Sequence, residues 1–141
     1  MKRIPTIALL TIASLGTATG AIAQDRVVKA NIPFNFTVGD TWMPAGEYTI
    51  SSPQREILQV RSVDRTKIAT IVDSESYNES TSGGKLVFDK YGNQYFLRHV
   101  LCPTVASLNV DLAQGKAEKR AHSRSLEANL HNPEETLVAV R

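Results

Sequence analysis

Hydrophobicity alternates residue by residue between positions 28 and 38, and this pattern constrains the fold more than any other feature of the chain. The even-numbered positions are all apolar: Val28, Ala30, Ile32, Phe34, Phe36 and Val38. Successive side chains of a β-strand point to opposite faces, so the pattern predicts one buried face and one solvent-exposed face. Because Pro33 has no backbone N–H, we expect the strand to lie at a sheet edge or to break there into two shorter strands.

Similar signals predict further strands along the chain. Alternating or apolar runs bounded by turn-forming residues are typical of strands. Such runs occupy residues 47–50, 57–63, 68–72, 107–112 and 137–140. The run at 68–72 is almost entirely apolar, which predicts burial on both of its faces.

A β-hairpin is expected over residues 85–101. The dipeptide Gly92-Asn93 is a signal for a two-residue turn. A tight turn would place Phe88 opposite Leu97 and Leu86 opposite His99. Aromatic and branched side chains on neighbouring strands stabilise such a pair, so the hairpin is predicted to form early in folding.

One helix is expected near the end of the chain. Residues 116–128 are rich in Ala, Glu, Lys and Arg, which favour helix formation, and their thin apolar stripe predicts a helix on the surface. Residues 24–141 are thus expected to form a single all-β domain with one peripheral C-terminal helix. The predicted architecture is an antiparallel β-sandwich or a partly open barrel of about seven or eight strands.

Residues 1–23 are typical of a secretory signal peptide. Lys2 and Arg3 precede an apolar stretch, and Ala21-Ile22-Ala23 fits a cleavage site of the A-x-A type. The apolar stretch is shorter than the roughly 20 residues of a membrane-spanning helix, which argues against a retained anchor. We therefore predict cleavage between Ala23 and Gln24 and a secreted or periplasmic protein with no stable membrane span.

Removal of this leader makes the chain nearly neutral. The full sequence has 16 Lys and Arg against 14 Asp and Glu, and Lys2 and Arg3 belong to the leader. The mature chain would then balance 14 basic and 14 acidic residues, which disfavours nucleic acid as a partner. The expected partner is a protein or a glycan of the envelope.

The basic stretch at 116–124 fits either a contact with anionic lipid or polysaccharide or an ordinary solvated helix face.

Three segments of the chain match those of a known group of proteins. They read IPFNFTVG at residues 32–39, MPAGEYT at 43–49 and LVFDKYGNQYFL at 86–97. The chain thereby resembles a group of small exported bacterial proteins, most of them uncharacterised, that share IPFxFxVG, LPAGEYT and LVFxxYGxxYFL segments. Met43 stands where leucine is usual in the group. The resemblance implies secretion and an all-β domain, and it carries over no catalytic residues.

The sequence predicts no catalytic, cofactor or metal site. The histidines have no spacing typical of metal ligands. Cys102 follows His99 by three residues, which places the two on opposite faces of a strand, so a buried and unreactive thiol is the favoured interpretation. Trp42 lies between two turn signals, where it is either exposed for binding or plugs one end of the fold, and the plug is the favoured interpretation. The candidates for a surface contact are Trp42, Arg98 and His99.

These features favour a non-enzymatic exported β-module with a binding or structural role at the cell envelope or outside the cell. Two other classes stay open at this point. One is a small-ligand carrier with an apolar cavity inside a barrel. The other is a small hydrolase acting on envelope polymers, for which Asp89, His99 and Cys102 are the candidate residues.

Overall fold

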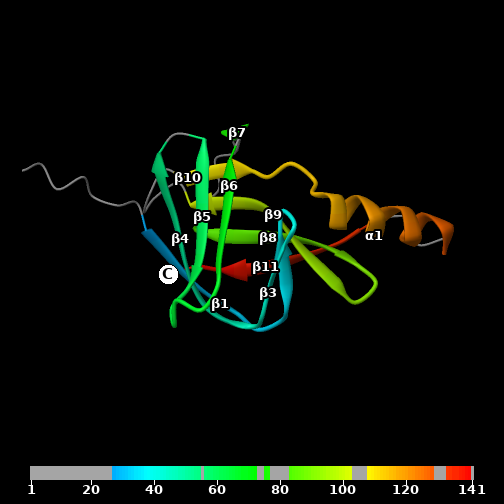
Figure 1. The fold of residues 1–141 in the computed structure, drawn as a ribbon, viewed down its shortest axis with the longest axis horizontal. Helices are drawn as coiled ribbons and strands as arrows, with labels where there is room; N and C mark the ends of the chain where they lie inside the picture. Colours follow the sequence, from blue (N-terminus) through cyan, green and yellow to red (C-terminus); the bar gives the residue numbers. More distant parts are fainter. Residues whose placement is uncertain are drawn as a thin grey trace, which may run out of the picture.

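The computed structural model describes residues 27–54, 56–72, 75–76, 83–102, 108–128 and 133–140. In this part of the chain eleven strands form two sheets that pack face to face, and one helix lies outside one of the sheets (Figure 1). The predicted all-β sandwich with a C-terminal helix is confirmed, and the strands form two sheets rather than a closed barrel. The strands outnumber the seven or eight expected because several are only two or three residues long. The predicted leader, with its cleavage site between Ala23 and Gln24, lies outside the described residues.

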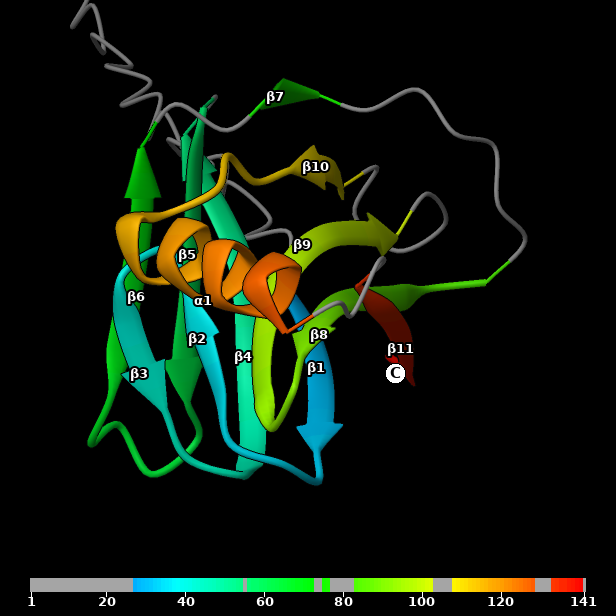
Figure 2. The same ribbon diagram turned by 90° about the vertical axis from the view of Figure 1, so that its right-hand side faces the viewer.

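Sheet A has the strand order β1-β4-β5-β6 (Figure 2). Its strands are β1 (Val27–Ile32), β4 (Gly46–Gln54), β5 (Ile57–Ser62) and β6 (Ile68–Val72). Buried and less buried residues alternate along the whole of β1 and β5, as expected for pleated strands with one covered face. Every second side chain of these strands therefore faces sheet B, and the side chains between them face outward.

Sheet B has the strand order β11-β8-β9-β10-β7. Its strands are β11 (Glu134–Ala139), β8 (Lys85–Tyr91), β9 (Gln94–Cys102), β10 (Leu108–Asp111) and β7 (Glu75–Ser76). Two further strands, β2 (Phe36–Val38) and β3 (Thr41–Met43), form an antiparallel pair, and β2 runs parallel to β9. The β8–β9 hairpin is thus central to the sheet, because β11 pairs with β8 while β10 and β2 pair with β9.

Aromatic side chains fill the space between the two sheets. Phe36, Tyr48 and Phe88 are each at most 1% exposed. The ring of Phe36 packs edge-on against both others, with centroids 5.0 Å from Tyr48 and 5.5 Å from Phe88. Phe34 extends this cluster by stacking on Tyr95, with centroids 4.1 Å apart. Such offset and edge-to-face contacts add to the free energy gained by burying the rings.

Pro33 divides the first alternating segment, as the sequence predicts. β1 ends at Ile32 in sheet A, and β2 begins at Phe36 in sheet B. Asn35 holds the connection, since its side-chain oxygen accepts a hydrogen bond from the backbone N–H of Ala45 at 2.9 Å. The alternation continues across the break because the chain passes from one sheet to the other while its apolar face stays toward the core.

The β8–β9 hairpin departs from its predicted register. Phe88 lies opposite Leu97, as expected, but Leu86 lies opposite Val100 rather than His99. The cause is a β-bulge, in which β9 has one residue more than β8 beyond Leu97. A tight turn at Gly92 does not reveal such an insertion, because the turn sets the register only of the residues next to it.

β6 is an edge strand, and the prediction that it is buried on both faces is wrong. Among the described strands it pairs only with β5. Ala69 is 1% exposed, whereas Ile68 and Val72 are 47% and 70% exposed. A short apolar run does not distinguish a central strand from an edge strand, because the sheet topology decides which strands have neighbours on both sides.

Helix α1 (Lys116–Glu127) lies on the outer face of sheet B (Figure 2). Ala121 is 5% exposed and packs with Tyr91 and Phe96 of the β8–β9 hairpin. Its small side chain lets the helix approach the sheet closely. The predicted surface helix at 116–128 is confirmed.

The start of α1 depends on the turn between β2 and β3. The N-cap residue Gly115 has no capping side chain, and the carboxylate of Asp40 instead accepts a hydrogen bond from the backbone N–H of Ala117 at 3.1 Å. A carboxylate at this position also interacts favourably with the helix dipole. A Cβ atom on Gly115 would lie 2.4 Å from the carbonyl oxygen of Gly39. The helix therefore begins where two backbone segments touch and only glycine fits.

We expect Phe88→Ala to lower the free energy of unfolding by about 3–5 kcal/mol. The substitution removes a ring that is 0% exposed and packs against Phe34 and Phe36. Trp42→Ala is the matched control, because Trp42 is 55% exposed and its loss should change stability by only about 0.5 kcal/mol. Urea unfolding of the chain from residue 24 onward, followed by circular dichroism, measures both. Equal losses in the two variants would contradict this placement of the aromatic core.

Candidate functional site

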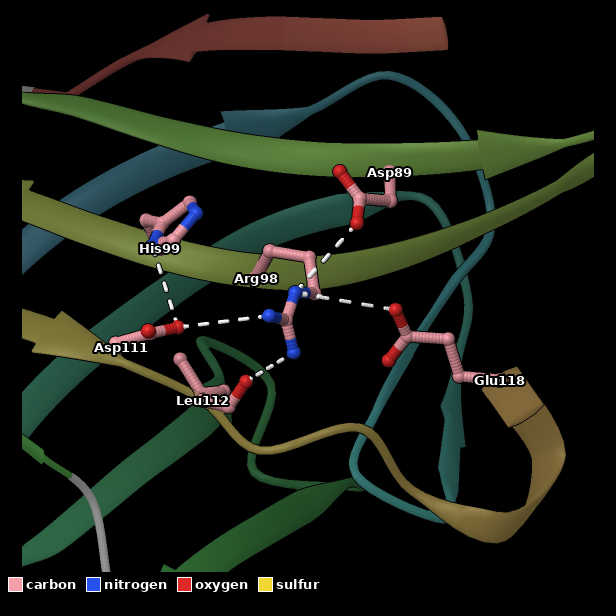
Figure 3. Close-up of polar contacts among 6 residues, drawn as sticks. All are labelled: Asp89, Arg98, His99, Asp111, Leu112 and Glu118. Carbon is pink, nitrogen blue, oxygen red and sulfur yellow. Dashed lines mark hydrogen bonds and ion pairs between the residues drawn. The ribbon is translucent and has the colours of Figure 1, made fainter. Parts of the chain in front are cut away.

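The β-bulge in β9 brings Arg98 and His99 to the same side of sheet B. Arg98 is the extra residue, between Leu97 and His99. Neighbouring side chains of a regular strand point to opposite faces, but a bulge re-aims them. Both side chains reach Asp111 of β10, and Nδ1 of His99 lies 3.3 Å from its Oδ1 atom (Figure 3). We refer to Asp89, Arg98, His99, Asp111 and Glu118 as the Arg98 cluster.

The guanidinium group of Arg98 lies at the centre of this cluster. Its Nε atom is 3.5 Å from Oδ2 of Asp89 and 3.9 Å from Oε1 of Glu118. Its Nη2 atom is 3.7 Å from Oδ1 of Asp111. Its Nη1 atom donates a hydrogen bond to the carbonyl oxygen of Leu112, and the N–H of Leu112 donates to the carbonyl oxygen of Arg98 at 2.8 Å. One cation therefore contacts three carboxylates from three different elements.

Glu118 is the most buried carboxylate of the cluster, with 3% of the residue exposed. It belongs to the first turn of α1 and meets Arg98 at the contact between helix and sheet. Burial raises the pKa of Glu118 to about 7, against the opposing attraction of Arg98. Burial also raises the pKa of Asp89, with Arg98 again opposing the shift. The cluster has more carboxylates than cations, which further favours a protonated carboxyl group.

The Arg98 cluster joins α1 to the three strands that lie beneath it. Asp89 is on β8, Arg98 and His99 are on β9, and Asp111 is on β10. Within the described ranges, no three His, Cys, Asp or Glu side chains are arranged to hold a metal ion. What the arrangement can do chemically is hold or release a proton at Glu118 near neutral pH while it fastens the helix to the sheet.

Cys102 lies apart from the Arg98 cluster. It is 0% exposed in the core between the sheets, and burial raises the pKa of its thiol to about 11. A nucleophilic thiolate needs a lowered pKa or an adjacent base. His99 is three residues away on β9 and faces the other side of the sheet. The structure therefore does not bring this histidine and this thiol together, and the predicted buried thiol is confirmed.

Trp42 is exposed, so the favoured interpretation that it plugs one end of the fold is wrong. It lies on β3 opposite Thr37 of β2, and 55% of it is exposed. Of the three residues predicted for a surface contact, the structure places Arg98 and His99 in one partly buried cluster and Trp42 outside it. Of these three candidates, Trp42 is the one with a largely exposed side chain.

A depression of about 340 Å³ on the outer face of sheet A was not predicted from the sequence. We call it the sheet-face depression. Its lining includes Lys29, Thr49, Ser51, Gln59, Arg61 and Arg65. All but Arg65 are outward-facing positions of strands, and the polar half of each alternating pattern is the signal that could have identified them. Only the strand order β1-β4-β5 shows that they are neighbours.

Comparison with known proteins leaves the family open. No protein-family model, curated protein or solved structure matches the chain. The resemblance to small exported bacterial proteins stays a prediction. In the part of the chain that the structure describes, no helix is both long enough and apolar enough to cross a membrane.

We expect Glu118→Gln to flatten the dependence of stability on pH. The pKa of Glu118 is about 7 in the folded protein, above the ordinary value of 4.5, so the folded state binds this proton more tightly than the unfolded chain. The resulting stabilisation is fully present below about pH 4.5 and is lost as the pH rises to about 7. One pKa unit corresponds to about 1.4 kcal/mol, so this loss is at most about 3–4 kcal/mol in the original protein.

Urea unfolding at about pH 4.5, 6 and 7.5 measures this difference. The slope of the free energy of unfolding against pH should be less steep in Glu118→Gln than in the original protein. Glu127→Gln, at the exposed far end of the same helix, is the control and should retain the original slope. The same slope in all three proteins would mean that Glu118 is not shielded from water.

Proposed function

We propose that this protein is an exported, non-enzymatic β-sandwich module that binds a protein or glycan polymer at the cell envelope or outside the cell. The observation that supports this most directly is the sheet-face depression of about 340 Å³. It is an open, concave surface made by neighbouring strands, with polar side chains directed outward. Such a surface suits a long chain that lies across it.

The two outer faces of the sandwich differ. The outer face of sheet B is covered in part by α1, which packs on Tyr91 and Phe96. Of the described elements, the helix contacts β8 of sheet B, whereas the outer face of sheet A carries the open sheet-face depression. The face that carries the depression is therefore the one with room for a partner.

Hydrogen-bonding groups on this face are held at the fixed spacing of a sheet. Thr49 pairs with Arg61, and Ser51 pairs with Gln59 along the antiparallel β4–β5 ladder. All four side chains are partly exposed. Groups on paired strands need little further ordering when a partner binds, so less conformational entropy is lost.

We propose a non-catalytic role because the three candidate reactive side chains are held in structural contacts. Asp89 pairs with Arg98, His99 lies against Asp111 in the same cluster, and Cys102 is buried in the core. A hydrolase built on these three residues would need them at one site. Their distribution favours a role for the first two in holding α1.

A small-ligand carrier is the second candidate function, and one observation favours it. A groove of about 580 Å³ lies between β1 of sheet A and β11 of sheet B, within the usual size range of ligand sites. Leu137 and Val63 line it and are 58% and 51% exposed. An apolar fluorescent dye that binds there, and is lost in Leu137→Ser, would support a carrier.

We expect the double substitution Ser51→Ala with Gln59→Ala to weaken polymer binding by about tenfold. It removes two hydrogen-bonding groups from the sheet-face depression and leaves its charges in place. Co-sedimentation of the chain from residue 24 onward with isolated envelopes and with purified envelope polymers measures the affinity. The control pair Gln94→Ala with Ser123→Ala alters exposed residues on the helix side and should leave the affinity unchanged. Equal affinity of the two double variants, or no binding at all, would contradict the proposal.

A further inference from the structure

We propose that the sheet-face depression recognises an acidic polysaccharide through the carboxylates of its uronate units. This inference rests on the proposed binding function and assigns a ligand class to the same site. Three cationic residues line the depression and no carboxylate does: Lys29, Arg61 and Arg65. The charge of the surface is therefore complementary to that of the proposed ligand.

Lys29 and Arg61 belong to one row of residues across sheet A. Thr49 lies opposite Lys29 on β1 and opposite Arg61 on β5. Neighbouring strands are about 4.8 Å apart, so the two cationic residues are anchored about 10 Å from each other with a hydroxyl between them. A sugar chain with an acid group on each unit has the same order of groups, with hydroxyls between charges.

The cations of the depression have no carboxylate partner among the described residues. The described cations that form ion pairs with carboxylates are Lys90 and Arg98, which lie outside the depression. Nη2 of Arg61 donates to Gln59 at 3.0 Å, whereas Nε of Arg61 is a buried atom with no acceptor among the described residues. The part of the Arg61 side chain that lines the depression is the part that a ligand can reach. A carboxylate oxygen of a bound uronate would give this guanidinium group the charged acceptor that it lacks among the described residues.

Arg65 is held at the end of the depression by the β5–β6 turn. Its φ is 60°, in the left-handed region that non-glycine residues rarely adopt. Its N–H donates to the carbonyl oxygen of Ser62 at 2.9 Å. The adjacent Asp64 carboxylate accepts hydrogen bonds from the N–H and the hydroxyl of Thr66, at 3.1 Å and 2.9 Å. Asp64 thus stabilises the turn, and the Arg65 guanidinium stays available to a ligand.

The extent of the positive surface favours spaced carboxylates over a dense row of phosphates. The next outward-facing pair of residues after Lys29 and Thr49 is Asn31 and Glu47. The carboxylate of Glu47 therefore limits the positively charged surface on that side. The chain from residue 24 onward has 14 basic and 14 acidic residues. Nucleic-acid affinity depends on neutralising many phosphates at once, which three cations in a neutral protein do not provide.

The test uses the chain from residue 24 onward and alginate, a polymer of uronates, as the probe. Its fully esterified form keeps the sugar backbone and removes the charges. Isothermal titration should show binding to alginate that is at least about tenfold tighter than to the ester and that weakens with added salt. The double substitution Lys29→Gln with Arg61→Gln should reduce the alginate affinity by about tenfold or more.

Lys119→Gln with Arg120→Gln is the control matched in charge, because it removes two exposed cations from α1. It should leave alginate binding unchanged, and urea unfolding of both double variants should confirm that neither loses its fold. An equal loss of affinity in the two variants would overturn the inference, since binding would then follow net charge rather than the site.

The remaining outcomes separate this inference from the proposed function. Equal binding of alginate and its ester, lost in Ser51→Ala with Gln59→Ala, would overturn the ligand class and leave a polymer-binding module. Binding of DNA or of vesicles with anionic lipid as tight as that of alginate would also overturn the ligand class. No binding to alginate, its ester, envelopes or other envelope polymers would overturn both proposals.

Discussion

Burial of one face of each sheet against the other is the constraint on which the rest of this structure depends. It requires every second residue of the facing strands to be apolar, and it leaves the alternate residues free to vary. Phe36, Tyr48 and Phe88 show how fully the inner positions are used. The outward-facing residues of sheet B pack against α1. The outer positions of sheet A are the ones that remain for contact with other molecules.

The contact between α1 and sheet B combines a favourable apolar part with a less favourable charged part. The packing of Ala121 against Tyr91 and Phe96 removes apolar surface from water. Beside it, Arg98 compensates the charges of several carboxylates, and Glu118 has almost no access to water. A buried ion pair of this kind contributes little net free energy, because desolvation offsets the attraction. Because burial raises the pKa of Glu118 to about 7, the stability of this contact is expected to change with pH near neutrality.

Local features of the fold could be predicted from the sequence, and features set by distant partners could not. The break at Pro33, the hairpin turn at Gly92 and the helix after residue 115 each follow from residues close together in the chain. The bulge at Arg98 and the exposure of Ile68 depend on which strands become neighbours. The same limit applies to the candidate sites: Lys29 and Arg61 look like ordinary outward-facing residues until β4 is known to lie between their strands.

The pairing of β11 with β8 has a consequence for how the chain reaches its final state. These strands are far apart in sequence, and the ion pair between Lys90 and Glu134 joins residues 44 positions apart. Because β8 and β9 are neighbours in sequence, their hairpin can form before β11 pairs with β8. Until then one edge of β8 has unpaired backbone groups, which are a template for pairing with another chain. The pairing of β11 with β8 therefore also covers an edge that would otherwise be open to aggregation.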